Sequence, residues 1–378
     1  MRICSDLLSA TQALKLRRKE LTPAVLYDFL GSLRHCEIQV VGQSGGGRDI
    51  FSVKAGRGKQ KVLLWSQMHG NEPSSPLALL AVLEFLCHSK HKVAAGILDK
   101  LTLLAIPMLN PDGAQRRERR NAMGIDLNRD ARLTVAPESK VLKTLASNFM
   151  PDWAFNMHDQ EIYYGTDFSP WPTSLALLAS SPAPGSKGTQ RLQETKSVIG
   201  NIASQLGMEI HLAKYSDVYM PAAFGDYFAS QGIHTILFET GYFVKDSDRQ
   251  KATFYHALAV FYALKAIAYR EYSLVDARFY DNLPFNKKHK FYDIILRGVE
   301  VRTQEYTFTA DIALSRDRRD REHFTDYDTD YLVYDFGDLT GKHAFYDLDC
   351  SGKLFLDFIP GLYQKFNKYM LQCDLSFL

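Results

Sequence analysis

The sequence predicts an α/β protein with a mixed, mostly parallel sheet that carries helices on both faces, followed by a small β-rich C-terminal domain. Two observations lead to this prediction. Apolar runs of strand length alternate with segments whose apolar residues recur at helical spacing, which is typical of a parallel sheet with crossover helices. After about residue 275 the helical patterns stop, and short strand patterns joined by charged or glycine turns replace them.

The N-terminal part begins with helical patterns and continues with a hairpin. Helices are expected over 6–16 and 22–34, and Thr22 with Pro23 makes a good N-cap and first position for the second helix. Strand patterns then flank the glycine-rich segment Gly42–Arg48, which reads as the turn of a hairpin.

Four apolar runs then form the expected centre of the sheet, and each stops at a polar residue. Because carboxyl ends of parallel strands meet at one edge of a sheet, the four polar residues should lie along that edge. The runs are 61–68, 101–108, 153–157 and 235–238, ending at His69, Asn110, His158 and Glu239. Helical patterns cover 77–86, 139–149, 190–206, 222–230 and 250–269.

The second domain is expected to begin in a linker around 275–290, which contains Pro284 and the basic run 286–290. We therefore divide the chain into domains 1–275 and 276–378. Its expected strands are 293–296, 299–303, 308–314 and 331–335. The segment Arg316–Glu322 has charges of both signs, which indicates a solvated loop.

Composition excludes several classes of protein. Of 378 residues, 46% are hydrophobic and 23% charged, and the formal net charge is only +2, so neither a nucleic-acid nor a membrane partner is indicated. The five cysteines form no CxxC pair, which argues against a disulfide framework or a thiolate zinc site. The N-terminus lacks the apolar core of a secretory signal, so we expect a cytoplasmic protein. Ala257–Ala268 is too short to cross a membrane and reads as a core helix.

The residues at the expected sheet edge suggest a metal site. His69 and Glu72 are three residues apart after a buried strand, and a catalytic zinc takes three such protein ligands while leaving a position for water. Further along, the arginine-rich stretch 110–130 contains Asn128 next to Arg129, and an amide beside a guanidinium is a good receptor for a carboxylate.

The ordered motifs resemble those of the zinc carboxypeptidases of the carboxypeptidase A type. These motifs are HxxE at 69–72, NPDG at 110–113, RxN at 119–121 with GIDLNR at 124–129, a His after a strand, and Phe-Glu239 after another. The resemblance covers about Gln39 to Tyr269 and implies a carboxypeptidase-like fold, one Zn²⁺ per chain, and a peptide substrate with a free C-terminal carboxylate.

The resemblance also implies roles for individual residues. His69, Glu72 and His158 match the zinc ligands, and Glu239 matches the general base. Arg119 matches the arginine that polarises the scissile carbonyl, Asn128 and Arg129 match the pair that binds the terminal carboxylate, and Tyr219 matches a mobile tyrosine that covers the substrate. Arg120 is the rival of Arg119, but the two-residue step to Asn121 favours Arg119.

Some features leave alternatives open. Asp130 departs from the family pattern, and Gly225 and Asp226 lie near the position that sets side-chain preference without deciding it. No inhibitory pro-domain fits into the first 40 residues, which favours intracellular trimming of peptides, including cell-wall peptides. HGNE and DLNR also resemble zinc deacylases of the aspartoacylase or succinylglutamate desuccinylase type, although the NPDG loop favours a peptidase. The third hypothesis is an inactive peptide-binding module. The sequence carries no signal for the oligomeric state.

Overall fold

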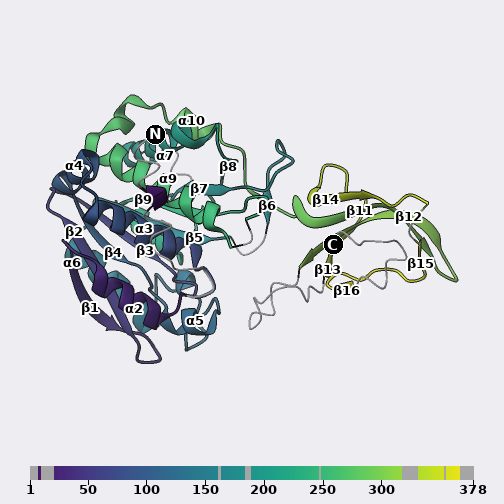
Figure 1. Ribbon diagram of the computed structural model, residues 1–378, viewed down its shortest axis with the longest axis horizontal. Helices are drawn as coiled ribbons and strands as arrows, with labels where there is room; N and C mark the ends of the chain where they lie inside the picture. The colour runs from purple at the N-terminus through teal and green to yellow at the C-terminus, as the bar shows by residue number, and fades with distance from the viewer. Residues whose placement is uncertain are drawn as a thin grey trace. The chain divides into compact units, whose positions relative to one another are not determined.

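The protein is described by a computed structural model over residues 7–9, 21–160, 163–183, 189–246, 248–316, 331–352 and 355–366 (Figure 1). Two compact units divide the chain. Unit 1 consists of Met1–Gln160 and Ser174–Phe285, and unit 2 of Glu161–Thr173 and Asn286–Leu378. The helix expected over 6–16 lies largely outside the described residues. Only 7–9 of this stretch are described, and they are helical.

Unit 1 is built around an eight-stranded mixed sheet in the order β1-β2-β4-β3-β5-β9-β7-β8. Its central strands β4, β3, β5 and β9 are parallel to one another, whereas β1, β2 and β7 join through antiparallel pairs. The strands are β1 (Glu37–Gln43), β2 (Asp49–Gly56), β3 (Gln60–Ser66), β4 (Leu101–Ile106), β5 (Trp153–Asp159), β7 (Leu175–Ala179), β8 (Leu212–Lys214) and β9 (His234–Thr240).

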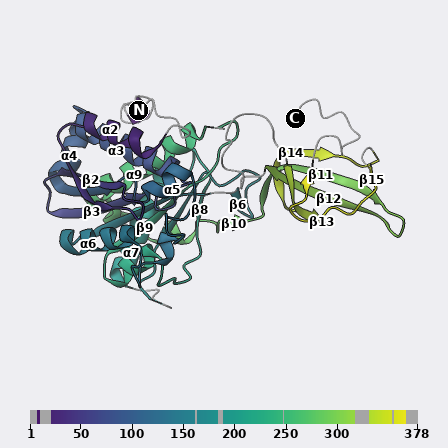
Figure 2. The same ribbon diagram turned by 90° about the horizontal axis from the view of Figure 1, so that it is seen from below.

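Helices cover both faces of this sheet, which explains why its central strands are apolar throughout (Figures 1 and 2). Successive side chains of β3 enter different cores. Val62 and Leu64 pack with residues of α3, α7 and α9, whereas Leu63 and Trp65 pack with residues of α6 and α8. The helices are α2 (Pro23–Ser32), α3 (Ser74–His88), α4 (Lys92–Lys100), α5 (Pro111–Arg116), α6 (Pro137–Phe149), α7 (Gln190–Leu206), α8 (Phe224–Ser230), α9 (Gln250–Tyr269) and α10 (Arg278–Asp281), with 3₁₀ turns η1 (Leu127–Arg129) and η2 (Glu271–Leu274).

Unit 2 is a β structure with its own core. A six-stranded sheet has the order β14-β11-β12-β13-β16, with β15 paired to β11, and a two-stranded sheet joins β10 to β6. The strands are β6 (Tyr164–Gly165), β10 (Lys287–Lys288), β11 (Phe291–Arg302), β12 (Thr307–Arg316), β13 (Tyr331–Gly337), β14 (His343–Asp349), β15 (Phe355–Leu356) and β16 (Lys365–Phe366). Because β6 comes from the middle of the chain, unit 2 includes the segment that directly follows β5 of unit 1.

The predicted fold class is confirmed, and differences from the expected elements are local. The two strands expected over 293–296 and 299–303 are one strand, β11, with a bulge between Leu296 and Val299, where Gly298 has φ +65°. Strands β6, β7, β8, β10, β14, β15 and β16 and the helices α4, α5 and α10 were not expected. Within unit 1 the chain continues to Phe285, beyond the boundary at 275 that the sequence suggested, and the loop expected over 316–322 lies outside the described residues after Arg316.

None of the described helices is long and apolar enough to cross a membrane. The longest, α9, contains the stretch Ala257–Ala268, and most of its residues are buried in the core of unit 1. It is therefore a core helix, as the sequence predicted.

Candidate metal centre

The HGNE stretch forms the turn between β3 and α3, and close backbone contact with the NPDG loop fixes this turn. A Cβ on Gly70 would lie only 1.9 Å from the carbonyl carbon of Gly113, so glycine is required there. Asn110 caps α5 by accepting a hydrogen bond from Gly113 N at 2.9 Å, and its amide donates to Met68 O at 3.2 Å. The two motifs therefore support each other structurally.

The other two strand-end residues lie next to each other in the sheet. His158 on β5 and Glu239 on β9 are partners in the parallel register. His158 is buried, whereas Glu239 is half-buried on β9, where most of the other residues are buried. Polar side chains thus gather at the carboxyl edge of the central strands, as expected for such a sheet.

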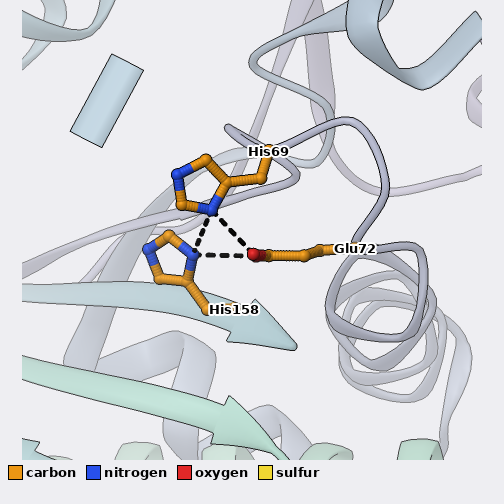
Figure 3. Close-up of side chains that lie close together, drawn as sticks. All are labelled: His69, Glu72 and His158. Atoms are coloured by element: carbon orange, nitrogen blue, oxygen red, sulfur yellow. Dashed lines mark hydrogen bonds and ion pairs between the residues drawn. The ribbon is translucent and has the colours of Figure 1, made fainter. Parts of the chain in front are cut away.

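Three of these side chains converge on one point (Figure 3). His69 Nδ1 lies 2.7 Å from Glu72 Oε1, His158 Nδ1 lies 2.8 Å from Glu72 Oε2, and the two imidazole nitrogens are 3.2 Å apart. All three side chains are at most 3% exposed. Buried polar groups at this spacing form a candidate metal site.

The electrostatics of the cluster keep its carboxylate ionised. Burial alone would raise the pKa of Glu72, but the charges and hydrogen bonds of His69 and His158 outweigh it and hold that pKa well below its usual range. Burial lowers the pKa of His158, which favours a neutral imidazole with a free lone pair. For His69, burial acts in the same direction, but Glu72 and Asp126 outweigh it and raise the pKa.

Asp126 is the partner that sequence reasoning did not assign. Its Oδ1 lies 3.0 Å from His69 Nε2, the ring nitrogen that faces away from Glu72. Its Oδ2 accepts a hydrogen bond from Arg119 Nε at 3.1 Å. Burial would raise the pKa of Asp126, but hydrogen bonding to His69 and the nearby guanidiniums hold it well below its ordinary value. Such a carboxylate fixes both the tautomer and the orientation of a ligand histidine.

The structure distinguishes the two adjacent arginines. Arg119 Nη1 lies 3.5 Å from Glu72 Oε1, whereas Arg120 is exposed and donates to Gly124 O at 2.8 Å. Only Arg119 of this pair is therefore brought to the cluster among the described contacts. The loop that carries it is held by Asn121, whose amide donates to the buried carboxylate of Glu138 at 3.0 Å.

The expected substrate-binding residues are placed less uniformly. Asn128 Nδ2 is 3.5 Å from His158 Nε2, and its Oδ1 accepts from Phe224 N at 3.1 Å, so this side chain borders the cluster. Arg129 is exposed, with Nη1 donating to Asn128 O at 2.7 Å. Tyr219 is half-buried on the segment between β8 and α8, and no described contact joins it to the cluster.

Asp226, near the expected position for side-chain preference, has a local structural contact. Its Oδ2 accepts from Met220 N at 2.6 Å, which ties the segment next to Tyr219 to the start of α8. Burial raises the pKa of Asp226. A Cβ on Gly225 would lie 2.9 Å from Ser180 Oγ, so this position has little space for a larger residue.

Asp159 is a further residue that the sequence did not reveal. Its carboxylate accepts from Ser74 N at 2.7 Å and Ser75 N at 2.8 Å, which caps the start of α3. Its own N–H donates to Glu72 Oε2 at 3.2 Å. Asp159 therefore links the strand end that carries His158 to the helix that follows Glu72.

Two buried imidazoles and a carboxylate, with an arginine and an asparagine at their edge, thus form a candidate metal site at the carboxyl edge of the unit 1 sheet. A family model described as zinc carboxypeptidase matches residues 33–230, and the chain belongs to this family. Zinc is accordingly the metal of this family, and His69, Glu72 and His158 are the grouped residues able to hold it.

Individual relatives match over a shorter stretch. Probable carboxypeptidase 2 of Trichophyton verrucosum is 35% identical over 113 residues, which are 29% of this chain and 21% of that protein. Carboxypeptidase D of Homo sapiens is 30% identical over 121 residues, which are 27% of this chain and 9% of that protein. The match thus spans about a fifth or less of these relatives' length.

Solved structures share the fold. A metallo-carboxypeptidase from Burkholderia cenocepacia aligns with a TM-score of 0.51 at 20% identity, covering 63% of this chain and 68% of that one. Bovine thrombin-activatable fibrinolysis inhibitor, solved with a tick carboxypeptidase inhibitor, aligns with a TM-score of 0.54 at 14% identity, covering 68% of this chain and 99% of that one. At these identities the likeness establishes the fold.

The donor set fits a zinc ion on chemical grounds. Two imidazole nitrogens that lie 3.2 Å apart, both against one carboxylate, face a common point, where each offers a lone pair once it is deprotonated. Nitrogen and carboxylate oxygen are zinc ligands, and three protein ligands leave a position for water. The partner of His69 on its other nitrogen, Asp126, completes the arrangement found around metal-binding histidines.

Proposed function

We propose that this protein is a zinc-dependent carboxypeptidase that hydrolyses the C-terminal amide bond of a peptide. The convergence of His69, Glu72 and His158 beside the strand end that carries Glu239 is the observation that supports it most directly. Zinc bound there would polarise a carbonyl and lower the pKa of a water to about 7.

Glu239 is the general base in this proposal. It is the register partner of His158 on the neighbouring strand, and its side chain is half-buried, which leaves part of it exposed. Its carboxylate takes the proton of the attacking water and passes it to the leaving amine.

Arg119 and Asn128 act on the substrate. Arg119 lies within 3.5 Å of Glu72 and stabilises negative charge that develops on the carbonyl oxygen, a contribution of about 3 kcal/mol by analogy with single oxyanion donors. Asn128 and the exposed Arg129 bind the terminal carboxylate and so select the last peptide bond. Tyr219 closes over the bound end of the peptide.

The substrate class and location belong to the same proposal. We infer an intracellular peptide with a free C-terminal carboxylate, such as a fragment of cell-wall peptide, and a cytoplasmic enzyme. Among the described residues, Cys36 and Cys87 are free thiols, which suits a reducing compartment. Immunodetection in fractionated cells tests this location, and recovery only outside the cytoplasm would contradict it.

The test of activity compares blocked dipeptides with N-acyl amino acids. The zinc-loaded protein is expected to hydrolyse the dipeptides, whereas turnover of the N-acyl amino acids alone would identify a deacylase, and turnover of neither would indicate a binding module. Glu239→Gln should abolish hydrolysis while keeping the metal. His69→Ala and His158→Ala should both lose zinc, and full zinc content in either variant would refute its assignment as a ligand.

A further inference from the structure

A buried arginine outside the metal cluster holds the ends of the two strands that carry His158 and Glu239. Arg249 lies at the start of α9 and is only 1% exposed. Its guanidinium stacks on the ring of Tyr242 at 4.4 Å from the centroid. A buried cation is costly unless hydrogen bonds and charge compensate it, so such a residue requires a structural or functional reason.

The backbone at Arg249 strengthens this point. Its φ is +54°, in the left-handed region that residues with a Cβ rarely adopt. Glycine would be the cheaper residue for this conformation at the start of a helix. The contacts of the arginine side chain, rather than the backbone conformation, therefore explain why this position is an arginine.

The guanidinium donates to backbone carbonyls of both strand ends. Nη1 donates to Gln160 O at 3.2 Å, just after β5, and Nη2 donates to Thr240 O at 2.5 Å and Gly241 O at 2.9 Å, at the end of β9. Gln160 N also donates to Thr240 O at 2.9 Å. Gln160 is two residues after His158, and Thr240 directly follows Glu239. The guanidinium thus bridges the two strands where their regular pairing ends.

The carboxylate that compensates the charge of Arg249 belongs to Asp159, which also contacts Glu72. Arg249 Nη1 lies 3.9 Å from Asp159 Oδ2, and both side chains are buried. Asp159 caps α3 through Ser74 and Ser75, and its N–H donates to Glu72 Oε2. One guanidinium is therefore connected, through at most one further residue, to the segments that carry His158, Glu239 and Glu72.

We propose that Arg249 is a positioning residue that sets the spacing between the metal-binding cluster and the general base. The proposal rests on the function proposed above for His158 and Glu239. Without the guanidinium, three carbonyls at the strand ends lose a charged donor, and the residues next to them gain freedom. Because a misplacement of about 1 Å can cost about 100-fold in rate, small shifts here would matter.

The experiment compares Arg249→Met with a control at an exposed arginine, Arg191→Met. Arg191 also donates from Nη1 to a backbone carbonyl, that of Gly232, but this contact precedes β9 and lies at the other end of the strand. Zinc affinity is measured by chelator competition. Hydrogen exchange is followed in the metal-free protein over 156–160 and 236–241, and kcat and KM are measured on a blocked dipeptide.

For Arg249→Met we expect zinc affinity and kcat to fall about 10–100-fold, as for other residues that orient ligands, with faster exchange in both strand ends. KM should change little, because the residues proposed to bind the carboxylate do not contact Arg249 among the described contacts. Arg191→Met should match the wild type. A folded Arg249→Met with wild-type zinc affinity, exchange and kcat would overturn the proposal.

A second variant keeps the test decisive if Arg249→Met does not fold. Arg249→Ala is assayed with added guanidinium ion, which can occupy the vacated site, and recovery of kcat and zinc affinity supports a positioning role. If added guanidinium recovers neither kcat nor zinc affinity and the variant also has a lower melting temperature, Arg249 has a general stabilising role and the proposal is overturned. If the wild type binds zinc but hydrolyses no dipeptide, the proposed function fails, while zinc affinity and exchange still test Arg249.

Discussion

Replacing Asp126 by asparagine tests how the metal cluster is oriented, because this substitution keeps the shape of the side chain and removes its charge. Asp126 accepts from three donors: His69 Nε2 at 3.0 Å, Arg119 Nε at 3.1 Å and Asn128 N at 3.0 Å. An amide retains one acceptor oxygen, so its NH₂ group must face one of these donors. At least one charge-assisted hydrogen bond is therefore lost.

The magnitude follows from that loss. A hydrogen bond to a charged group contributes about 1.5–3 kcal/mol, and each 1.4 kcal/mol changes an equilibrium constant about ten-fold. Zinc should therefore bind about 10–100-fold more weakly to Asp126→Asn, which agrees with typical losses when the partner of a ligand histidine is removed.

Competition with a chromophoric chelator measures this affinity directly. Asp152→Asn is the control, because Asp152 Oδ2 also accepts a hydrogen bond, from Lys61 N at 2.8 Å, but at the opposite end of β5. Wild-type zinc affinity in a folded Asp126→Asn protein would refute the idea that this carboxylate orients His69. An equal loss in both variants would point to general destabilisation.

Four further substitutions give distinct outcomes. Arg119→Ala should lower kcat by about 100-fold while Arg120→Ala leaves it near the wild-type value; equal effects in steady-state kinetics would reverse the assignment. Asp112→Asn should reduce the free energy of unfolding by about 1.5–3 kcal/mol at pH 7 in urea titrations, because a guanidinium and a backbone N–H bond its carboxylate. Burial would raise the pKa of Asp112, but its hydrogen bonds outweigh burial and lower that pKa in the folded protein. The stability that Asp112 contributes is therefore present above about pH 4 and is lost as the pH falls through the lowered folded pKa. A stability difference between wild type and Asp112→Asn that persists at low pH would contradict this. Gly70→Ala should destabilise the protein by at least about 3 kcal/mol in the same titrations, since its Cβ would lie 1.9 Å from backbone of Gly113, and wild-type stability would contradict that contact.

The ligand candidates could be predicted from sequence because their signal is local. Each of His69, His158 and Glu239 directly follows an apolar run, and parallel strands place such residues at one edge. The structure brings His69, Glu72 and His158 together and puts Glu239 in register beside them. Tyr219 has no comparable signal, and its proposed role depends on the family resemblance alone.

The residues that hold this cluster in place could not be predicted, because their contacts join distant parts of the chain. Asp126 and His69 are 57 positions apart, and Arg249 and Gln160 are 89 apart, with no periodic pattern that marks either pair. Asp159 follows His158 directly, yet its function as a helix cap depends on where α3 begins in space.

The same reasoning explains the misjudged elements. Strands β7 and β8 are short, five and three residues, and their place in the sheet is set by pairing with β9 and with each other. The segment Glu161–Thr173 joins unit 2 through β6, which pairs with β10 over a separation of more than 100 residues, and through Tyr163, whose hydroxyl donates to Asp293 at 2.8 Å. Local patterns carry no information about such pairings.

Charge balance at the cluster connects the metal to the kind of substrate proposed. Glu72 and Asp126 both have a pKa held well below the ordinary range, so both are anionic, and Arg119 neutralises one of these charges. Metal-bound histidines are neutral, so in the metal-loaded site Glu72, Asp126 and Arg119 would together carry about one net negative charge, and a divalent cation would convert it to about one net positive charge. Glu239, ionised as a general base must be, offsets that charge, so the exposed Arg129 supplies the positive charge that attracts an anionic group. A peptide that presents its terminal carboxylate satisfies this requirement, whereas a peptide with an amidated end does not. Amidation of an otherwise good substrate should therefore raise KM strongly. An unchanged KM would show that these charges do not select the substrate.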